Sequence, residues 1–484
     1  MGPSWTDPRT GEIINASVYV YHNLVSILYS WRFIQTAATD PEVRVKILPE
    51  EIMGDAIRYV CRHEVGHCLG FMHNMGASAS YPVEKLRDPE FTQQYGTTPS
   101  IMDYARFNYI AQPGDKEKGV KLTPPVLGEY DYFLIKWNYS PLLDAHTTEE
   151  EVATLNQWVS EKAGDPKYRY GKQQIYTQYD PSALSEDLGD DAMRASEYGI
   201  KNLKYILSNL NSWFENNDKD YSHRFMLYNE VVQQYVRYLN HVFANIGGIY
   251  LTERYVGDPR PSYETVPKEK QTRALQFLMK QVTDLKWIEN KDLLKNFSLI
   301  GSPTSDLQTE IITRIVGAVD KLPLCVAKTD KDPYTPEECL NEIYNFVWAK
   351  TLNGGRTNPT DRKMQDAFVN ALISKGSGKS SGGMLTLGIT DQFKNIQVPE
   401  YIKEKSLQDF GINNLHEEKI SNEEVSGFGF LQAINYTTSP SLSPLYYGLL
   451  MKTKSLLEKH QNYTSMETRN HYQLLLRRIE KALK

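Results

Sequence analysis

The run HEVGHCLGFMH at residues 63–73 constrains this chain more than any other feature. His63 and His67 lie four residues apart, so on a helix both imidazoles point to one side and can bind the same ion. Gly70 allows the backbone to leave the helix in a conformation that other residues avoid, and this turn can bring His73 round as a third ligand. Three neutral imidazoles with one open position are typical of a catalytic zinc ion. The run therefore predicts one bound Zn²⁺ held by these three histidines.

Glu64 lies between the first two histidines, on the flank of the same helix face. Its carboxylate can reach a water molecule at the metal without binding the metal, which is the position of a general base. One alternative is an ordinary solvated charge on a helix surface. Another is a purely structural zinc site, although such sites are usually rich in cysteine. Cys61 and Cys68 point away from the histidine face, so we expect both to be buried packing thiols.

The composition is that of a globular protein and excludes several classes. Of the 484 residues, 40% are hydrophobic and 24% are charged, and the net charge is −6. This balance gives no reason to expect a nucleic acid as the ligand. No run of about 18 apolar residues is present, so we expect no membrane-spanning helix. The first fifteen residues have neither a basic start nor an apolar core, so they do not resemble a signal peptide.

Periodicity predicts an α+β chain. The segment Gly11–Val20 is rich in Ile, Val and Tyr after a turn-like DPRTG, which indicates a strand. Helices are expected around residues 24–31, from Pro49 to Gly70, and over 127–137. Residues 74–125, with scattered Gly and Pro, are expected to be mostly irregular.

The same patterns predict four consecutive segments. Residues 1–140 form the zinc-binding catalytic domain, 141–373 a region with strong helical stripes, 374–383 a Gly/Ser-rich loop or linker, and 384–484 a C-terminal helical region. The stripes are expected to form core rather than a site. The segment SKGSGKSSGG ends like a phosphate-binding loop, but that pattern requires glycine where Ile373 stands, so a flexible linker is the better interpretation.

Two further groups of residues are weaker candidates. Asp187, Asp190 and Asp191 crowd into one stretch. They are candidate calcium ligands, because Ca²⁺ prefers oxygen ligands, but a cap on the following helix is the favoured interpretation. Cys325 and Cys339 flank a loop-like stretch, where a disulfide and two free thiols both stay open.

The pattern HExxHxxGxxH resembles that of the metzincin clan of zinc endopeptidases, which also have a methionine-containing turn beneath the metal. The run SIMDY at residues 100–104 is similar to that turn. The resemblance implies that Met102 forms the hydrophobic floor under the three histidines. It also implies that Tyr104 lies near the metal, where its hydroxyl can donate a hydrogen bond to a developing oxyanion.

Longer stretches, among them GPSWTDPRTGEIINA, LGEYDYFLIKW and EDLGDDAMRASEYGIKNLK, resemble a family of large bacterial met-zincins that are typically exported. The resemblance implies a small mixed sheet, a zinc helix and a Met-turn, followed by the helical region. It further implies N-terminal domains outside this chain and an extracytoplasmic location, whether periplasmic, outer-membrane-associated or secreted. Only about 45 residues precede the zinc helix, so either part of the sheet is missing or the fold is reduced.

The same resemblance gives expectations for the substrate cleft. Gly11–Val20 would be the edge strand, to which a peptide or protein substrate pairs in extended form. Residues 105–109, just after the turn, would form the wall of the pocket beyond the cleaved bond.

These features predict a zinc-dependent endopeptidase that hydrolyses peptide bonds with Glu64 as the general base. Two alternatives stay open. One is a zinc-containing binding or scaffold protein that cleaves nothing, although a pure binder needs no base. The other is a zinc amidase that acts on a non-peptide substrate, which would share the site and differ only in the cleft.

Overall fold

The computed structural model describes residues 4–174, 178–254, 257–329, 331–376, 441–460, 462 and 465–483. Most of the predicted linker at 374–383, and the first part of the predicted C-terminal region, lie outside the described residues. By its contacts the chain divides into two compact units, Met1–Phe368 with His460–His471, and Val369–Lys459 with Tyr472–Lys484. The four predicted segments stay predictions.

Helices dominate the described residues, and the strands are few and short, which confirms the α+β class. In chain order the elements are β1 (Ser4–Thr6), β2 (Ile13–Ala16), α1 (Leu24–Thr36), α2 (Glu50–Cys68), α3 (Pro89–Tyr95), α4 (Glu129–Tyr139), α5 (Thr148–Ser160), α6 (Ala192–Phe214), α7 (Ser222–Phe243), β3 (Ile249–Leu251), β4 (Tyr263–Thr265), α8 (Lys268–Thr283), α9 (Lys291–Leu294), α10 (Pro303–Ala318), α11 (Leu322–Ala327), α12 (Pro336–Leu352), α13 (Pro359–Gly376), α18 (Ser443–His460) and α19 (Met466–Ala482). Short 3-10 helices lie at Pro41–Val43, Ser78–Ser80, Val83–Arg87, Pro166–Tyr168, Lys286–Ile288 and Val319–Lys321.

The described sheets are two antiparallel hairpins, β1 with β2 and β3 with β4, and not the mixed sheet that we expected. The predicted strand Gly11–Val20 is shorter, because β2 covers only its middle. A tight turn explains this difference: Gly11 has φ +75° and its N–H donates to the carbonyl of Asp7 at 2.8 Å. The turn folds the chain back, so β2 pairs with the residues just before it.

The helix that carries the motif, α2, begins after Pro49 and has two glutamates in its first turn, where the helix dipole favours negative charge. Its buried residues are Ala56, Tyr59, His63 and Gly66. They recur every three or four positions, so they form one face of the helix. Leu28 of α1 packs with Ala56 on this face, and α1 also contacts α6 and α7. The first histidine therefore lies on the buried face of α2.

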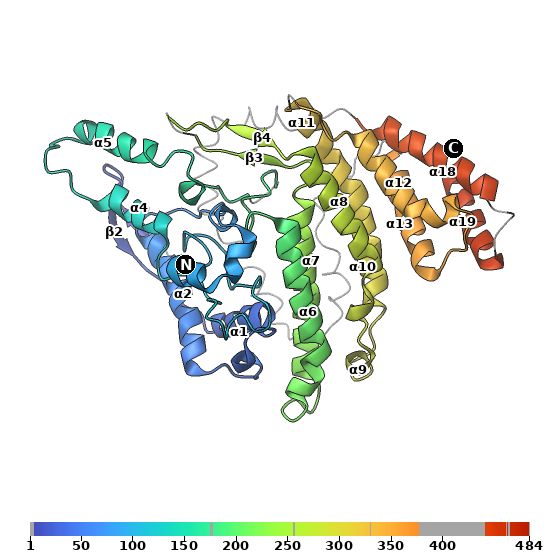
Figure 1. Cartoon of the computed structure of the whole chain (residues 1–484), viewed down its shortest axis with the longest axis horizontal. Helices are drawn as coiled ribbons and strands as arrows, with labels where there is room; N and C mark the ends of the chain where they lie inside the picture. The colour runs from blue at the N-terminus through green and yellow to red at the C-terminus, as the bar shows by residue number, and fades with distance from the viewer. Residues whose placement is uncertain are drawn as a thin grey trace. The chain divides into compact units, whose positions relative to one another are not determined.

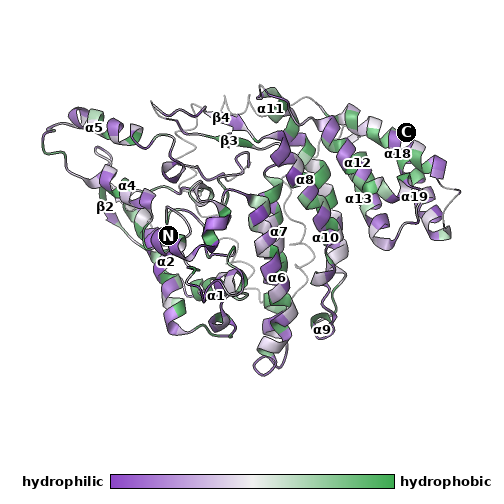
Figure 2. Ribbon diagram, in the orientation of Figure 1, coloured by the Kyte–Doolittle hydropathy of each residue, from purple (hydrophilic) through white to green (hydrophobic). Residues whose placement is uncertain are grey.

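The helices α6, α7, α8 and α10 lie side by side and pack against one another (Figure 1). The predicted stripe of α6 is buried, with Leu203, Ile206, Leu207 and Leu210 at most 1% exposed. Figure 2 shows apolar and polar residues on different sides of α6 and α7. The stripes are thus core, as predicted from a period near 3.6 residues.

The second unit is built mainly from α18 and from the ends of α13 and α19. Leu372, Leu450 and Leu457 are buried in it. None of the predicted site residues belongs to this unit.

All four cysteines are free thiols. Cys325 and Cys339 are buried and unbridged, which decides between the two alternatives for this pair. Cys61 and Cys68 are only half-buried, so the expectation of fully buried thiols was wrong. Both lie off the buried face of α2, where solvent still reaches one side of each side chain. No helix of the described residues is long and apolar enough to cross a bilayer.

Candidate metal centre

The end of α2 is shaped by Gly70, which has φ +83°. The N–H of Gly70 donates to the carbonyl of His67 at 2.9 Å, and the N–H of Phe71 donates to that of Gly66 at 3.0 Å. This pair of bonds is the Schellman motif, which ends helices at a left-handed glycine. The chain therefore turns back within three residues and carries His73 towards the helix, as the sequence predicted.

The three histidines of the motif converge. One candidate ligand atom from each of His63, His67 and His73 lies within 4.8 Å of the others. The Nε2 atoms of His67 and His73 are 3.0 Å apart. The ring of His63 lies 4.8 Å from that of His67 and 5.2 Å from that of His73, centroid to centroid. These rings form the one group of three or more metal-ligand side chains found among the described residues.

Each imidazole is oriented through its Nδ1 atom. His63 Nδ1 lies 2.6 Å from the carbonyl oxygen of Ile101, and His67 Nδ1 lies 2.8 Å from that of Phe71. His73 Nδ1 lies 2.8 Å from Oε1 of Gln173. Because carbonyl oxygens only accept, each Nδ1 carries the proton and each Nε2 keeps its lone pair. Such partners fix the orientation of metal-binding histidines in proteins.

Burial keeps the rings of His63 and His73 neutral. His63 and His73 are 5% and 8% exposed. Burial, and then the neighbouring histidines, lower the pKa of His63 well below its usual range and that of His73 to about 4. A neutral imidazole is the form that binds a metal ion, so these two rings need not lose a proton at neutral pH.

The donor set fits a zinc ion. Two Nε2 lone pairs that face each other at 3.0 Å repel unless a cation lies between them. Tetrahedral zinc with Zn–N bonds of about 2.0–2.1 Å holds its nitrogens about 3.3 Å apart. The spacing of His67 and His73 is close to this value, and the soft, neutral nitrogen donors suit Zn²⁺ better than Ca²⁺ or Mg²⁺.

Met102 lies beneath the histidine-bearing helix and is fully buried with Phe71 and Ile101. A Cβ atom built on Gly66 would overlap Sδ of Met102, so the methionine occupies the space that this glycine leaves open. Only glycine allows so close an approach without a shift of the neighbour. Gly66 thus allows Met102 to pack closely against α2, a role that the sequence did not predict.

The turn that carries Met102 is held by Asp131, a buried residue near the start of α4. Its carboxylate accepts from the Ser100 hydroxyl at 2.7 Å and from the N–H groups of Ile101 and Gly128 at 2.9 and 2.7 Å. Burial raises the pKa of Asp131, although these hydrogen bonds oppose the rise. In the sequence, Asp131 stands three positions after Gly128, the residue before α4. An acidic residue at this position is a known signal of a helix start.

The third histidine is supported by a distant segment. The N–H of Met75 donates to the carbonyl of Gly171 at 2.8 Å, and the N–H of Gly171 donates to Oδ1 of Asn74 at 2.8 Å. This ladder places Gln173 beside His73. No local pattern marks Gln173, because it follows His73 by a hundred residues.

Tyr104 and Glu64 are both half-buried beside the histidines. The ring of Tyr104 lies 4.7 Å from that of His73 and 5.2 Å from that of His63, centroid to centroid. Glu64 follows His63 directly on α2. The guanidinium of Arg106 lies 4.9 Å from the centre of the Tyr104 ring and forms an ion pair with Glu186. Both predicted catalytic residues therefore belong to the surroundings of the centre.

The residues expected to form a pocket wall, 105–109, are mostly buried. Ala105, Phe107 and Tyr109 are at most 1% exposed. Phe107 packs with Leu28 in the core between α1 and α2, where its burial is most favourable. Among Ala105, Arg106 and Phe107, only the Arg106 side chain is partly exposed.

The three aspartates of the calcium alternative serve separate partners. Asp191 caps α6 by accepting from the N–H groups of Met193 and Arg194. Asp190 accepts from the N–H of Val83 at 2.9 Å, and Asp187 accepts from the Ser78 hydroxyl at 3.2 Å. Asp191 therefore caps α6, which was the favoured interpretation. Nothing supports a calcium site at these three aspartates.

Comparison with known proteins gives one match. The model of the Met-zincin family matches residues 46–355, which is more than half of the chain and includes all three histidines, Met102 and Gln173. No curated protein and no solved structure matches the sequence. The family resemblance of the motif is thereby confirmed, and the chain belongs to the Met-zincin family.

Proposed function

We propose that this chain is a zinc-dependent endopeptidase. The observation that carries the proposal is the convergence of three imidazoles whose Nδ1 atoms are all engaged, with one candidate ligand atom of each within 4.8 Å of the others. His63, His67 and His73 would hold the ion, and its bound form would supply Lewis acidity to the reacting carbonyl. Family membership supports the same class of reaction.

The chain's own residues would then perform the proton transfers. Glu64, next to a ligand on the same helix, would take a proton from the attacking water and pass it to the leaving amine. The Tyr104 hydroxyl would donate to the oxyanion as it forms. Removal of one such donor costs about 2.7–4 kcal/mol of transition-state stabilisation in other enzymes.

The proposed substrate is a peptide or protein segment in extended form. In the hairpin, β2 pairs with β1 on one side only, and a Cβ on Gly70 would lie 3.5 Å from the Ile13 side chain of β2. The hairpin therefore lies beside the end of the motif helix. Its second edge offers backbone donors and acceptors to an added strand. An extracytoplasmic location is proposed on the family resemblance alone.

Glu64→Ala tests the proposal most directly. The variant should bind zinc with the stoichiometry of the unchanged protein but lose cleavage of a peptide library by several orders of magnitude, since the general base is removed. Glu51→Ala is the matched control, because Glu51 is an exposed residue in the first turn of the same helix.

Metal analysis and a digest with and without chelator complete the test. Cleavage by Glu64→Ala at the rate of the unchanged protein would exclude this mechanism. A zinc-loaded, unchanged protein that cleaves no peptide in the library but hydrolyses small amides would favour the amidase alternative.

A further inference from the structure

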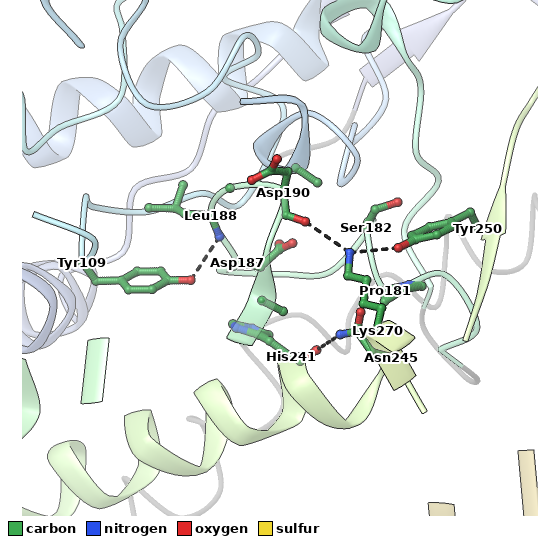
Figure 3. Close-up of a pocket in the computed structure, with 13 residues that line it drawn as sticks. Tyr109, Pro181, Ser182, Asp187, Leu188, Asp190, His241, Asn245, Tyr250 and Lys270 are labelled. Carbon is green, nitrogen blue, oxygen red and sulfur yellow. Dashed lines mark hydrogen bonds between the residues drawn. The ribbon is translucent and has the colours of Figure 1, made fainter. Parts of the chain in front are cut away.

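A cavity with several polar groups in its wall lies apart from the three histidines (Figure 3). Its volume is about 170 Å³. The segment of residues 181–192 encloses it together with the end of α7, β3 and the start of α8. The cavity is close to the Met-turn, because Asp187 in its wall and Asp103 in the turn both accept hydrogen bonds from Ser78.

One end of the cavity offers acceptors. His241 is 4% exposed, and its Nε2 lies 3.0 Å from the carbonyl oxygen of Ser185. The proton is therefore on Nε2, and Nδ1 keeps a lone pair that has no partner among the described residues. Asp187, 5% exposed, lies in the same wall. The Nδ1 atom itself has almost no accessible surface, so the acceptor in the wall of the cavity is Asp187.

The pKa values of His241 and Asp187 are both shifted towards their neutral forms. Burial lowers the pKa of His241 to about 4, so the ring is neutral. Burial, and then the neighbouring Asp103, raise the pKa of Asp187 well above its usual range. A cation brought next to Asp187 would favour its ionised form, because opposite charge at short range lowers the pKa of a carboxyl group.

The other end of the cavity offers donors. The Lys270 ammonium donates to the carbonyl of Asp190 at 3.2 Å and to the Tyr250 hydroxyl at 2.9 Å. An ammonium has three N–H groups, so one is left, and no ion pair joins Lys270 to a described carboxylate. Figure 3 shows Lys270 and Tyr250 on the opposite side of the cavity from Tyr109 and Leu188, with Asp187 between.

We propose that this cavity is a binding site for a small zwitterion, namely a free α-amino acid with a short side chain. The ammonium of the ligand would lie against Asp187, and its carboxylate against Lys270 and Tyr250. The volume sets the size, because an engineered cavity of about 150 Å³ holds benzene, and alanine has about as many heavy atoms. Large side chains would not fit.

The inference does not depend on the proposed peptidase activity, because its test measures binding. L-alanine is titrated into the full, zinc-loaded chain by calorimetry, with propionate and ethylamine as probes that each lack one charged end. Alanine should bind at least about tenfold more tightly than either truncated probe, since each loses a charge-assisted hydrogen bond.

Two variants locate the site. Lys270→Met should weaken alanine binding by about tenfold or more, and Asp187→Asn should do the same while it preserves the shape of the side chain. Lys280→Met is the control, because Lys280 is exposed on the same helix and should leave binding unchanged. Thermal unfolding verifies that each variant is folded.

Three results would overturn the inference. The first is no heat of binding at millimolar alanine, which would mean that the cavity holds water only. The second is equal affinity for alanine, propionate and ethylamine. The third is unchanged binding in folded Lys270→Met and Asp187→Asn.

Discussion

The metal centre and the helical region behind it are stabilised in different ways. Around the centre, residues 71–128 are mostly irregular, and buried polar groups such as Asp131 and Asn74 hold the backbone in place. In α6, α7, α8 and α10 the backbone bonds are satisfied within each helix, and apolar side chains fill the space between them. A loop can be buried only when other groups satisfy its backbone, so the centre depends on a few specific atoms.

This difference predicts two kinds of response to mutation. Loss of volume should weaken the helical region without disturbing the metal. Small changes of shape or of one hydrogen bond should disturb the centre more than they weaken the fold.

The largest loss of stability is expected in the helical core. Ile206→Ala should lower the free energy of unfolding by about 2–5 kcal/mol, because the fully buried Ile206 would leave a cavity. Zinc affinity in chelator competition should not change. The exposed Lys201 of the same helix provides a control, since Lys201→Ala should alter stability by at most about 0.5 kcal/mol. A large loss of zinc affinity in Ile206→Ala would show that the two regions are not independent.

Gly66→Ala should affect both stability and metal binding. The added methyl group would overlap Sδ of Met102 and should cost about 1–3 kcal/mol in urea unfolding. Zinc affinity should fall with it. Gly54→Ala is a matched control on the same helix, where the new Cβ meets only Arg58, 3.4 Å away, and where alanine should stabilise the protein by about 0.5–1 kcal/mol. Equal stabilisation by both changes would contradict the close packing of Met102.

Gln173→Ala should separate metal affinity from stability. Zinc binding should weaken by about 10–100-fold, because His73 would lose the partner that orients it. The urea midpoint of the metal-free protein should hardly move, since Gln173 is only half-buried. Gln173→Glu restores an acceptor and should recover most of the affinity, and Lys172→Ala on the exposed neighbour should have no effect. Equal zinc affinities for Gln173→Ala and the unchanged protein would remove this residue from the centre.

The smallest expected effect is a difference between two buried carboxylates in how stability depends on pH. Burial alone would raise the pKa of Asp218, which lies before α7, but hydrogen bonds from Arg224 and from the N–H of His223 outweigh it and lower the pKa to about 2. The ionised form is thus favoured in the folded state, and its contribution is present above about pH 4 and lost as the pH falls towards 2. The stability difference between the unchanged protein and Asp218→Asn should shrink by about 1 kcal/mol between about pH 6 and pH 3.

The buried Asp131 of the centre should behave in the opposite way. Its folded pKa is raised, so its contribution is most favourable in acid and is lost as the pH rises. Urea unfolding of Asp218→Asn and Asp131→Asn across this pH range compares the two carboxylates. An Asp218→Asn difference that stays constant with pH would contradict the assigned shift.

The sequence predicted those parts of the molecule that depend on local spacing. Residues four apart on a helix share a face, so the motif contained the histidines that the structure brings together, and the stripes of α6 and α7 contained their core residues. Gly70 at positive φ followed from the same run.

What the sequence did not predict depends on contacts between distant segments. Gln173 reaches His73 only through the ladder at Gly171, and Gly66 is required only because Met102 packs against it. The mixed sheet was expected from resemblance, whereas the turn at Gly11 forms a local hairpin instead. Residues 105–109 were expected to line a surface pocket, but Ala105, Phe107 and Tyr109 are buried.

The long reach of Gln173 has a consequence for the order of assembly. As the chain leaves the ribosome, the rings of His63 and His67 acquire their backbone acceptors from residues 101 and 71, whereas the ring of His73 stays unoriented until residue 173 has emerged and folded back. Tight uptake of an ion would therefore wait for residue 173 and would not directly follow synthesis of the motif. A nascent fragment that stops before that point would hold the ion by two fixed rings and exchange it readily.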